Sequence, residues 1–103
     1  MTAEEEKAYN LGILHVYKNL KENLESRLEW HQHCADNMLE EVNSEEYQKT
    51  ACKLEMIEDN RYIERRLAFV TQAEETLDYA KKMMKKQLST EHHDFYEELI
   101  KII

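Results

Sequence analysis

The stretch "VNSEEY", residues 42–47, separates two long helical patterns and so decides the fold. Either Asn43 or Ser44 can cap a new helix, and the two glutamates that follow would then lie at the positive end of its dipole. On both sides of the stretch, apolar residues recur every three or four positions, which is the period of one helix face. The chain has no proline and one glycine, Gly12, whereas sheets need frequent turn residues. We therefore expect an all-α fold.

Before this stretch, the pattern predicts a helix over residues 3–42. Thr2 and Glu5 fit the two key positions of a capping box at its start. Gly12 costs about 1 kcal/mol relative to alanine inside a helix, so it marks either a kink or a close approach by another backbone. The apolar stripe of this helix consists of Tyr9, Ile13, Tyr17, Leu20, Leu24, Leu28, His31, Ala35, Met38 and Val42.

After the stretch, the pattern predicts a second helix over residues 44–88. Glu58-Asp59-Asn60 interrupts the pattern, and we favour a polar patch on one continuous helix over a break near residues 59–60. Ser89-Thr90-Glu91 resembles a third cap and predicts a short helix over residues 90–102. The second stripe consists of Tyr47, Ala51, Leu54, Ile63, Leu67, Val70, Leu77, Ala80, Met84 and Leu88, among which Ile63, Val70, Leu77 and Met84 have the seven-residue spacing of a coiled coil.

These elements predict one domain over residues 1–103, an antiparallel hairpin of two long helices with a short C-terminal helix. The second helix carries an additional apolar run beside its main stripe. A helix that is apolar over so wide an arc packs against more than one neighbour, so we expect self-association into a helical bundle, as a dimer. The additional run consists of Tyr62, Phe69, Ala73 and Ala80.

Composition narrows the class of protein. The chain has 22 acidic and 14 basic residues and a net charge of -8, which opposes binding to nucleic acid. Its acidic start has no apolar signal-peptide core, and no apolar run is long enough to span a membrane. Two cysteines do not form a disulfide framework. We therefore expect a soluble protein of the reducing cytoplasm.

A possible metal site involves the stretch "EWHQHCAD", residues 29–36. If the turn centres on Asn43, its cysteine faces the other cysteine of the chain, and its first histidine faces a glutamate. Zinc binds such side chains in a tetrahedron. The plainer alternative is that the cysteines and the histidine fill the core. The four candidate ligands are His31, Cys34, Cys52 and Glu55.

Candidate partner-binding residues lie at the margins of the apolar stripes. Trp30 is about 100° away from the stripe of the first helix, and tryptophan is enriched among binding hot spots. The alternative is that Trp30 only flanks the core or the seam of a dimer. The C-terminal residues 97–103 end on bulky apolar side chains, which either dock near Tyr9 and Ile13 or insert into a groove of a partner. The candidates are Trp30, Tyr62, Phe69, Ile100 and Ile103.

We find no glycine-rich phosphate loop, nucleophile elbow, H-E-x-x-H motif or pair of Glu-x-x-His motifs, so we expect neither an enzyme nor a cofactor. The leading hypothesis is a cytoplasmic protein–protein interaction module, a small acidic regulator or inhibitor that binds a partner protein. One alternative is a metal- or thiol-dependent sensor built on the four candidate ligands. Another is an acidic mimic of nucleic acid, or a protein that contacts nucleic acid, in which Glu22, Glu25 and Glu29 share one face.

Overall fold

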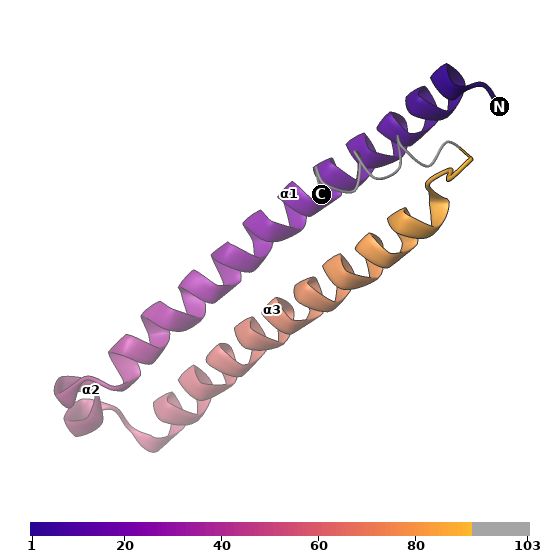
Figure 1. Cartoon of the computed structure of the whole chain (residues 1–103). Helices are drawn as coiled ribbons and strands as arrows, with labels where there is room; N and C mark the ends of the chain where they lie inside the picture. Colours follow the sequence, from indigo (N-terminus) through magenta and orange to yellow (C-terminus); the bar gives the residue numbers. More distant parts are fainter. Residues whose placement is uncertain (92–103) are drawn as a thin grey trace. The chain divides into compact units, whose positions relative to one another are not determined.

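The computed structural model describes residues 1–91, which form three α-helices and no strand (Figure 1). Helix α1 spans Ala3–Val42, α2 spans Glu45–Thr50 and α3 spans Lys53–Gln87. The expected all-α class with two long helices is therefore confirmed. A short helix is predicted over residues 90–102, and residues 92–102 of this range lie outside the described residues. In the described part of the chain, none of the helices is long and apolar enough to cross a membrane.

The start of α1 is capped by the predicted pair of residues. The backbone N–H of Glu5 donates to Thr2 Oγ1 at 3.2 Å, and the Thr2 hydroxyl donates to Glu5 Oε1 at 2.9 Å. The side chain of Thr2 thus satisfies one of the N–H groups that the first turn of a helix leaves unpaired. Three glutamates in the first turn also favour this end of the helix through its dipole.

The prediction of one continuous helix over residues 44–88 is wrong, because two helices occupy this range. Ser44 caps α2 by accepting the N–H of Tyr47 at 3.2 Å. Helix α2 ends at Thr50, and Ala51 is extended with φ -70° and ψ 134°. The break comes before residues 59–60, through which α3 is continuous, as we favoured.

A tertiary hydrogen bond accompanies the break between α2 and α3 and stabilises it. The hydroxyl of Tyr47 donates to Asp59 Oδ2 at 2.7 Å. In a continuous helix these two residues would be about 18 Å apart along the axis, since each residue rises 1.5 Å. The bond therefore forms only because the chain turns between α2 and α3. Helix propensity is a weak local preference. This hydrogen bond and the burial of the Tyr47 ring favour the turn between α2 and α3 against it.

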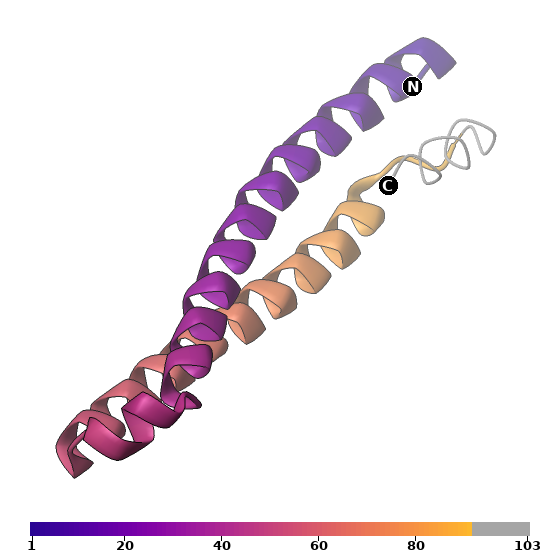
Figure 2. The same cartoon turned by 90° about the vertical axis from the view of Figure 1, so that its left-hand side faces the viewer.

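The chain divides into two compact units, which are described separately. Unit 1 consists of Met1–Glu22 and Leu77–Ile103, and unit 2 consists of Asn23–Thr76. Each unit contains one segment of α1 and one segment of α3 that lie side by side (Figures 1 and 2).

Unit 1 has a small apolar core and a buried pair of hydrogen bonds between Asn10 and Ser89, which we call the Asn10–Ser89 clasp. Tyr17, Met84 and Leu88 are buried together, with further apolar side chains packed around them. The fully buried side chain of Asn10 accepts the N–H of Ser89 at 2.8 Å and donates to the Ser89 carbonyl at 3.1 Å. This amide therefore pairs with both backbone groups of the residue that follows the last turn of α3.

Unit 2 is built on residues of the predicted stripes. Ile63 and Val70, two members of the seven-residue series, are buried, and so is Ala35 on α1. Leu54, which the second stripe placed in the core, is instead 65% exposed. Leu54 occupies the first turn of α3, just after the break that the sequence pattern did not reveal. The apolar pattern thus predicted the buried face of α3, but it did not predict that the first turn of α3 lies outside the core.

We expect Tyr47 to ionise at a higher pH than an ordinary tyrosine. Burial, and then its hydrogen bond to Asp59, raise the pKa of Tyr47 from 10.0 to about 12. A raised pKa in the folded state means that this contribution to stability is complete below pH 10 and is lost as the pH rises toward 12. A titration of tyrosinate absorbance should show a late step that Tyr47→Phe removes and Tyr79→Phe retains. A wild-type titration whose Tyr47-dependent step lies near pH 10 would contradict the buried bond.

Candidate interaction groove

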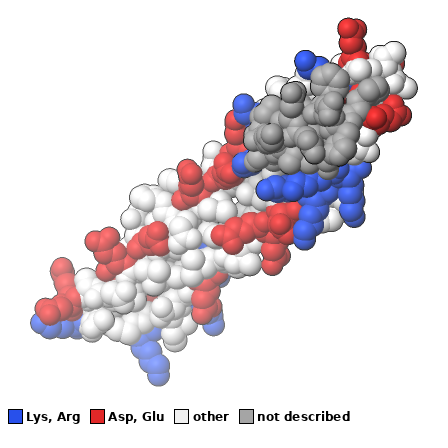
Figure 3. Space-filling view, in the orientation of Figure 1, with Lys and Arg blue, Asp and Glu red and all other residues white. Residues whose placement is uncertain are grey.

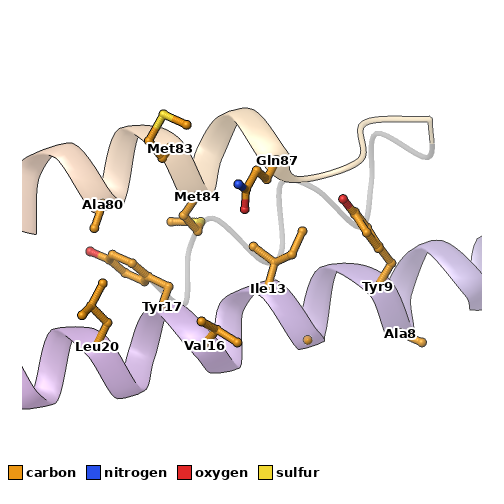
Figure 4. A pocket seen from close by; sticks show the side chains of 11 residues that line it. Ala8, Tyr9, Ile13, Val16, Tyr17, Leu20, Ala80, Met83, Met84 and Gln87 are labelled. Carbon is orange, nitrogen blue, oxygen red and sulfur yellow. The ribbon is translucent and has the colours of Figure 1, made fainter.

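An apolar groove lies between the α1 and α3 segments of unit 1 (Figure 4). Its volume is about 520 Å³, within the range of about 300–1,000 Å³ that is usual for binding sites. Most of the side chains that line it are apolar. Helix α1 contributes Tyr9, Ile13, Val16 and Leu20, and α3 contributes Ala80, Met83 and Met84.

Three large apolar side chains of α1 remain exposed along this groove. The exposed fraction is 47% for Tyr9, 68% for Val16 and 41% for Leu20. Their spacing of seven and then four residues puts them on one side of the helix. Singly exposed apolar residues are normal in proteins, but a row of them along a groove provides the kind of surface on which an amphipathic helix docks.

The single glycine of the chain lines the same groove. Within residues 1–91, and apart from the neighbouring backbone of α1 itself, no heavy atom lies within 4 Å of a Cβ built on Gly12, so no close approach of another described segment requires a glycine there. The residue nevertheless lowers the stability of the helix by about 1 kcal/mol relative to alanine. Its effect on the surface is to leave space at the middle of the groove, which a larger side chain would occupy.

Lysines gather on the last turns of α3, the helix that forms one wall of the groove. Figure 3 shows Lys and Arg atoms gathered over the last turns of this helix. Lys82 pairs with Asp78 at 3.1 Å, as its i,i+4 spacing indicates. Within residues 1–91, Lys81, Lys85 and Lys86 are exposed and form no ion pair. An apolar groove on a helix that carries several exposed lysines favours a ligand that combines apolar and acidic groups.

The register on which the metal prediction depends is wrong. His31 Nδ1 lies 2.9 Å from Nη1 of Arg66, and its ring stacks on Phe69 with centroids 4.8 Å apart. Arg66 lies eleven residues beyond Glu55 on α3, about 16 Å along the axis. His31 therefore faces a more distant part of α3 than a turn centred on Asn43 predicts, because the residues of α2 lengthen the connection.

The four proposed ligands thus do not form the expected cluster. Cys34 is half-buried and Cys52 is exposed, and both are free thiols. In the part of the chain that the structure describes, no group of three or more His, Cys, Asp or Glu side chains could hold a metal ion. The His31 ring instead belongs to a contact between α1 and α3 inside unit 2, which we call the His31–Arg66 latch.

The structure separates the predicted partner-binding residues into two kinds. Tyr62 and Phe69 belong to the surroundings of the latch, because the Arg66 guanidinium lies 5.0 Å above the Tyr62 ring and Phe69 stacks on His31. Trp30 has a tilted ring contact with His33, at 6.3 Å between centroids, and is 60% exposed. Trp30 is therefore the predicted residue that is best placed to meet another molecule. The remaining candidates, Ile100 and Ile103, lie outside the described residues.

Many residues of the groove belong to the first apolar stripe, which predicted that their side chains lie in the core. Tyr9 and Leu20 belong to the first stripe, yet both are exposed. Val16 lies beside that stripe and was not selected at all. A signal was present, because Ala8, Gly12 and Val16 recur every four residues beside the stripe and widen the apolar side of the helix. That width exceeds what contact with one neighbouring helix requires.

No protein-family model, curated protein or solved structure matches this chain.

Proposed function

We propose that this chain is a non-catalytic protein–protein interaction module that binds an amphipathic helix in the groove of unit 1. The observation that carries the proposal is the row of exposed apolar side chains formed by Tyr9, Val16 and Leu20 along the groove. Burying apolar surface contributes roughly 25 cal/mol per Å², so covering this row is favourable. A helix with apolar residues at matching intervals covers it most completely.

The groove also has side chains that adapt to a partner. Met83 and Met84 are unbranched and polarizable, so they can adjust to the shape of an incoming side chain. Methionine-rich surfaces are used by proteins that bind several helices. The lysines on α3 add a preference for a helix with acidic residues beside its apolar stripe. We therefore expect the partner segment to be an acidic amphipathic helix.

The proposal includes the architecture and the location of the module. We propose that α1 and α3 form an antiparallel hairpin along their length and that the protein acts in the cytoplasm as a small regulator or inhibitor. The side-by-side segments within each unit support the hairpin, and the two free thiols fit a reducing compartment. Self-association would cover the apolar surface that one hairpin leaves exposed.

Site-specific photo-crosslinking tests this function. A photoreactive phenylalanine analogue would replace Val16, which lies in the groove, or Lys18, which is exposed elsewhere on α1. After irradiation in the cells that produce the protein, we expect a discrete crosslinked product from position 16, with a defined helical segment at the crosslink. Position 18 should give no such product. Products that are the same from both positions would contradict a role for the groove.

The same assay separates this proposal from the thiol-sensor alternative. Replacement of both cysteines, Cys34→Ser with Cys52→Ser, should leave the position-16 product unchanged, because neither residue lines the groove. Loss of the product in this double variant would favour the sensor instead.

A further inference from the structure

We infer that a cleft inside unit 2 binds a small carboxylic acid with an aromatic body. The cleft lies between the α1 and α3 segments of this unit, and it is separate from the groove of unit 1. Its volume is about 550 Å³, which suits a small molecule. Among the residues that line it, α1 contributes Arg27 and His31, and α3 contributes Phe69, Gln72 and Ala73.

The His31–Arg66 latch determines which nitrogen of the His31 ring carries the proton. Nη1 of Arg66 lies 2.9 Å from Nδ1 of His31. A guanidinium group only donates hydrogen bonds, so Nδ1 is the acceptor and the proton of the neutral ring is on Nε2. Within residues 1–91, Nε2 forms no hydrogen bond. The cleft is therefore lined by a histidine whose N–H group is available to a ligand.

Arg27 supplies the positive charge of the cleft. It precedes His31 by four residues on α1, so the two side chains lie on the same face of the helix. Arg27 is exposed, and within the described residues it forms no ion pair or hydrogen bond. A guanidinium group presents its N–H groups in a planar fork that matches the two oxygens of a carboxylate. This face of α1 therefore offers a carboxylate both a cation and a neutral donor.

The α3 wall adds an amide to these donors. Gln72 is exposed, and its side chain has no hydrogen-bond partner in the part of the chain that the structure describes. Thr76, which also lines the cleft, donates its hydroxyl to the Gln72 carbonyl at 2.8 Å. No aspartate or glutamate is among the described residues that line the cleft. Donors without partners, and no acidic side chain beside them, favour an anionic ligand.

The apolar lining favours an aromatic body on this anion. The Phe69 ring stacks on His31 but remains 49% exposed. Ala73 is buried, and Leu24, which also lines the cleft, is half-buried. Aromatic rings pair favourably in offset or edge-to-face arrangements. A flat ring that packs against Phe69 therefore gains more from this wall than a polar group would.

The charge of unit 2 limits the ligand to a single negative charge. The unit has 13 acidic and 6 basic residues, a net charge of -7, so it does not attract anions from a distance. Charges more than about 10 Å apart are largely screened at an ionic strength of about 0.1 M, which leaves the contacts inside the cleft to decide binding. A single arginine matches a carboxylate better than a doubly charged phosphate.

An NMR titration of the isotope-labelled full-length protein with phenylpropionate tests this site. We expect the signals of Gln72 and Ala73 to shift, with a Kd of about 1 mM, as suits a ligand of this size. Phenylpropionamide has the same ring but no charge, and it should bind at least about 10-fold more weakly, because hydrogen bonds to a charged group are stronger. Equal affinities for the acid and the amide would overturn the recognition of a carboxylate.

Two arginine variants separate the cleft from the general effect of charge. Arg27→Gln should weaken the binding of phenylpropionate by about 10-fold or more. Arg61→Gln is the matched control, because Arg61 is also exposed in unit 2, does not line the cleft and carries the same charge. The control should leave the affinity nearly unchanged. The same loss of affinity in both variants would mean that net charge, and not this cleft, attracts the ligand.

Gln72→Glu tests the opposite wall independently of Arg27. Glutamate has nearly the shape and the helix propensity of glutamine, and the position is exposed, so the variant should fold, which circular dichroism would verify. Its carboxylate would compete with the ligand for Arg27 and repel it, and we expect binding to be lost. Unchanged binding would overturn the inference.

The location of the NMR shifts distinguishes this inference from the proposed function. Shifts at Gly12 and Val16 without any at Gln72 would overturn the cleft as the site of the acid. The proposed function would stand after that result, because its test is the crosslink at position 16 in the groove of unit 1.

Discussion

Tyr17→Ala should lower the free energy of unfolding by about 3–5 kcal/mol, the usual cost of removing a buried aromatic side chain. Tyr17 is buried against Met84 and Leu88 from the other helix segment of unit 1. Among the described residues, the buried core of this unit consists of these three apolar side chains, so alanine at position 17 would leave a cavity with few described neighbours to fill it. Since domains are commonly stable by 5–15 kcal/mol, this change would remove a large part of the total.

Urea unfolding followed by circular dichroism would measure this loss. Tyr79→Ala is the matched control, because the same side chain is removed from α3 at a position that is 66% exposed. We expect Tyr79→Ala to change stability by no more than about 0.5 kcal/mol. If the two variants were destabilised equally, the Tyr17 cluster would not be the core of unit 1.

Asn10→Ala should lower stability by about 3 kcal/mol because it leaves two backbone groups without their partner. The N–H and the carbonyl of Ser89 both bond to the Asn10 amide. Alanine has no polar atom to replace these bonds, and the fully buried position of the Asn10 side chain limits access of water. The higher helix propensity of alanine offsets only a part of this cost.

Asn19→Ala is the control for helix propensity. Asn19 is exposed on the same helix, and its amide nitrogen lies 3.4 Å from Nε2 of His15, one turn before it. We expect this variant to be within about 0.5 kcal/mol of the wild type. Hydrogen exchange provides a local measurement, because the Ser89 amide should lose protection in Asn10→Ala and keep it in Asn19→Ala. Unchanged protection in both variants would mean that the clasp does not hold the end of α3.

The apolar periodicity predicted where helices form better than it predicted which helix segments pack against each other. The first stripe and its Thr2 cap led to a helix with the bounds of α1, and the seven-residue series identified Ile63, Val70 and Met84, all of which are buried. These features depend on residues one or two turns apart, which the sequence displays directly. The metal cluster failed because it required a pairing of α1 with α3, and a pairing depends on the exact path of the connection.

The candidate groove could be predicted only in part. Tyr9, Ile13 and Leu20 were recognised as apolar positions of one stripe, but the stripe gives no measure of how much of it a single neighbouring helix covers. Trp30 was selected at the margin of that stripe and is exposed. The clasp at Asn10 could not be foreseen, because its partner is the backbone of Ser89, and backbone groups are the same at every residue of a sequence.

The sequence by itself determined that this protein is helical, where its first long helix begins and ends, and several of the α3 residues that are buried, such as Ile63, Val70 and Met84. Local rules suffice for these properties, because apolar period, caps and the absence of proline act within a few turns. Only the tertiary structure decided the break after α2, the pairing of His31 with Arg66 and the open groove beside Gly12. Each of these depends on groups far apart along the chain, such as Tyr47 and Asp59, whose hydrogen bond forms only when the chain turns between α2 and α3.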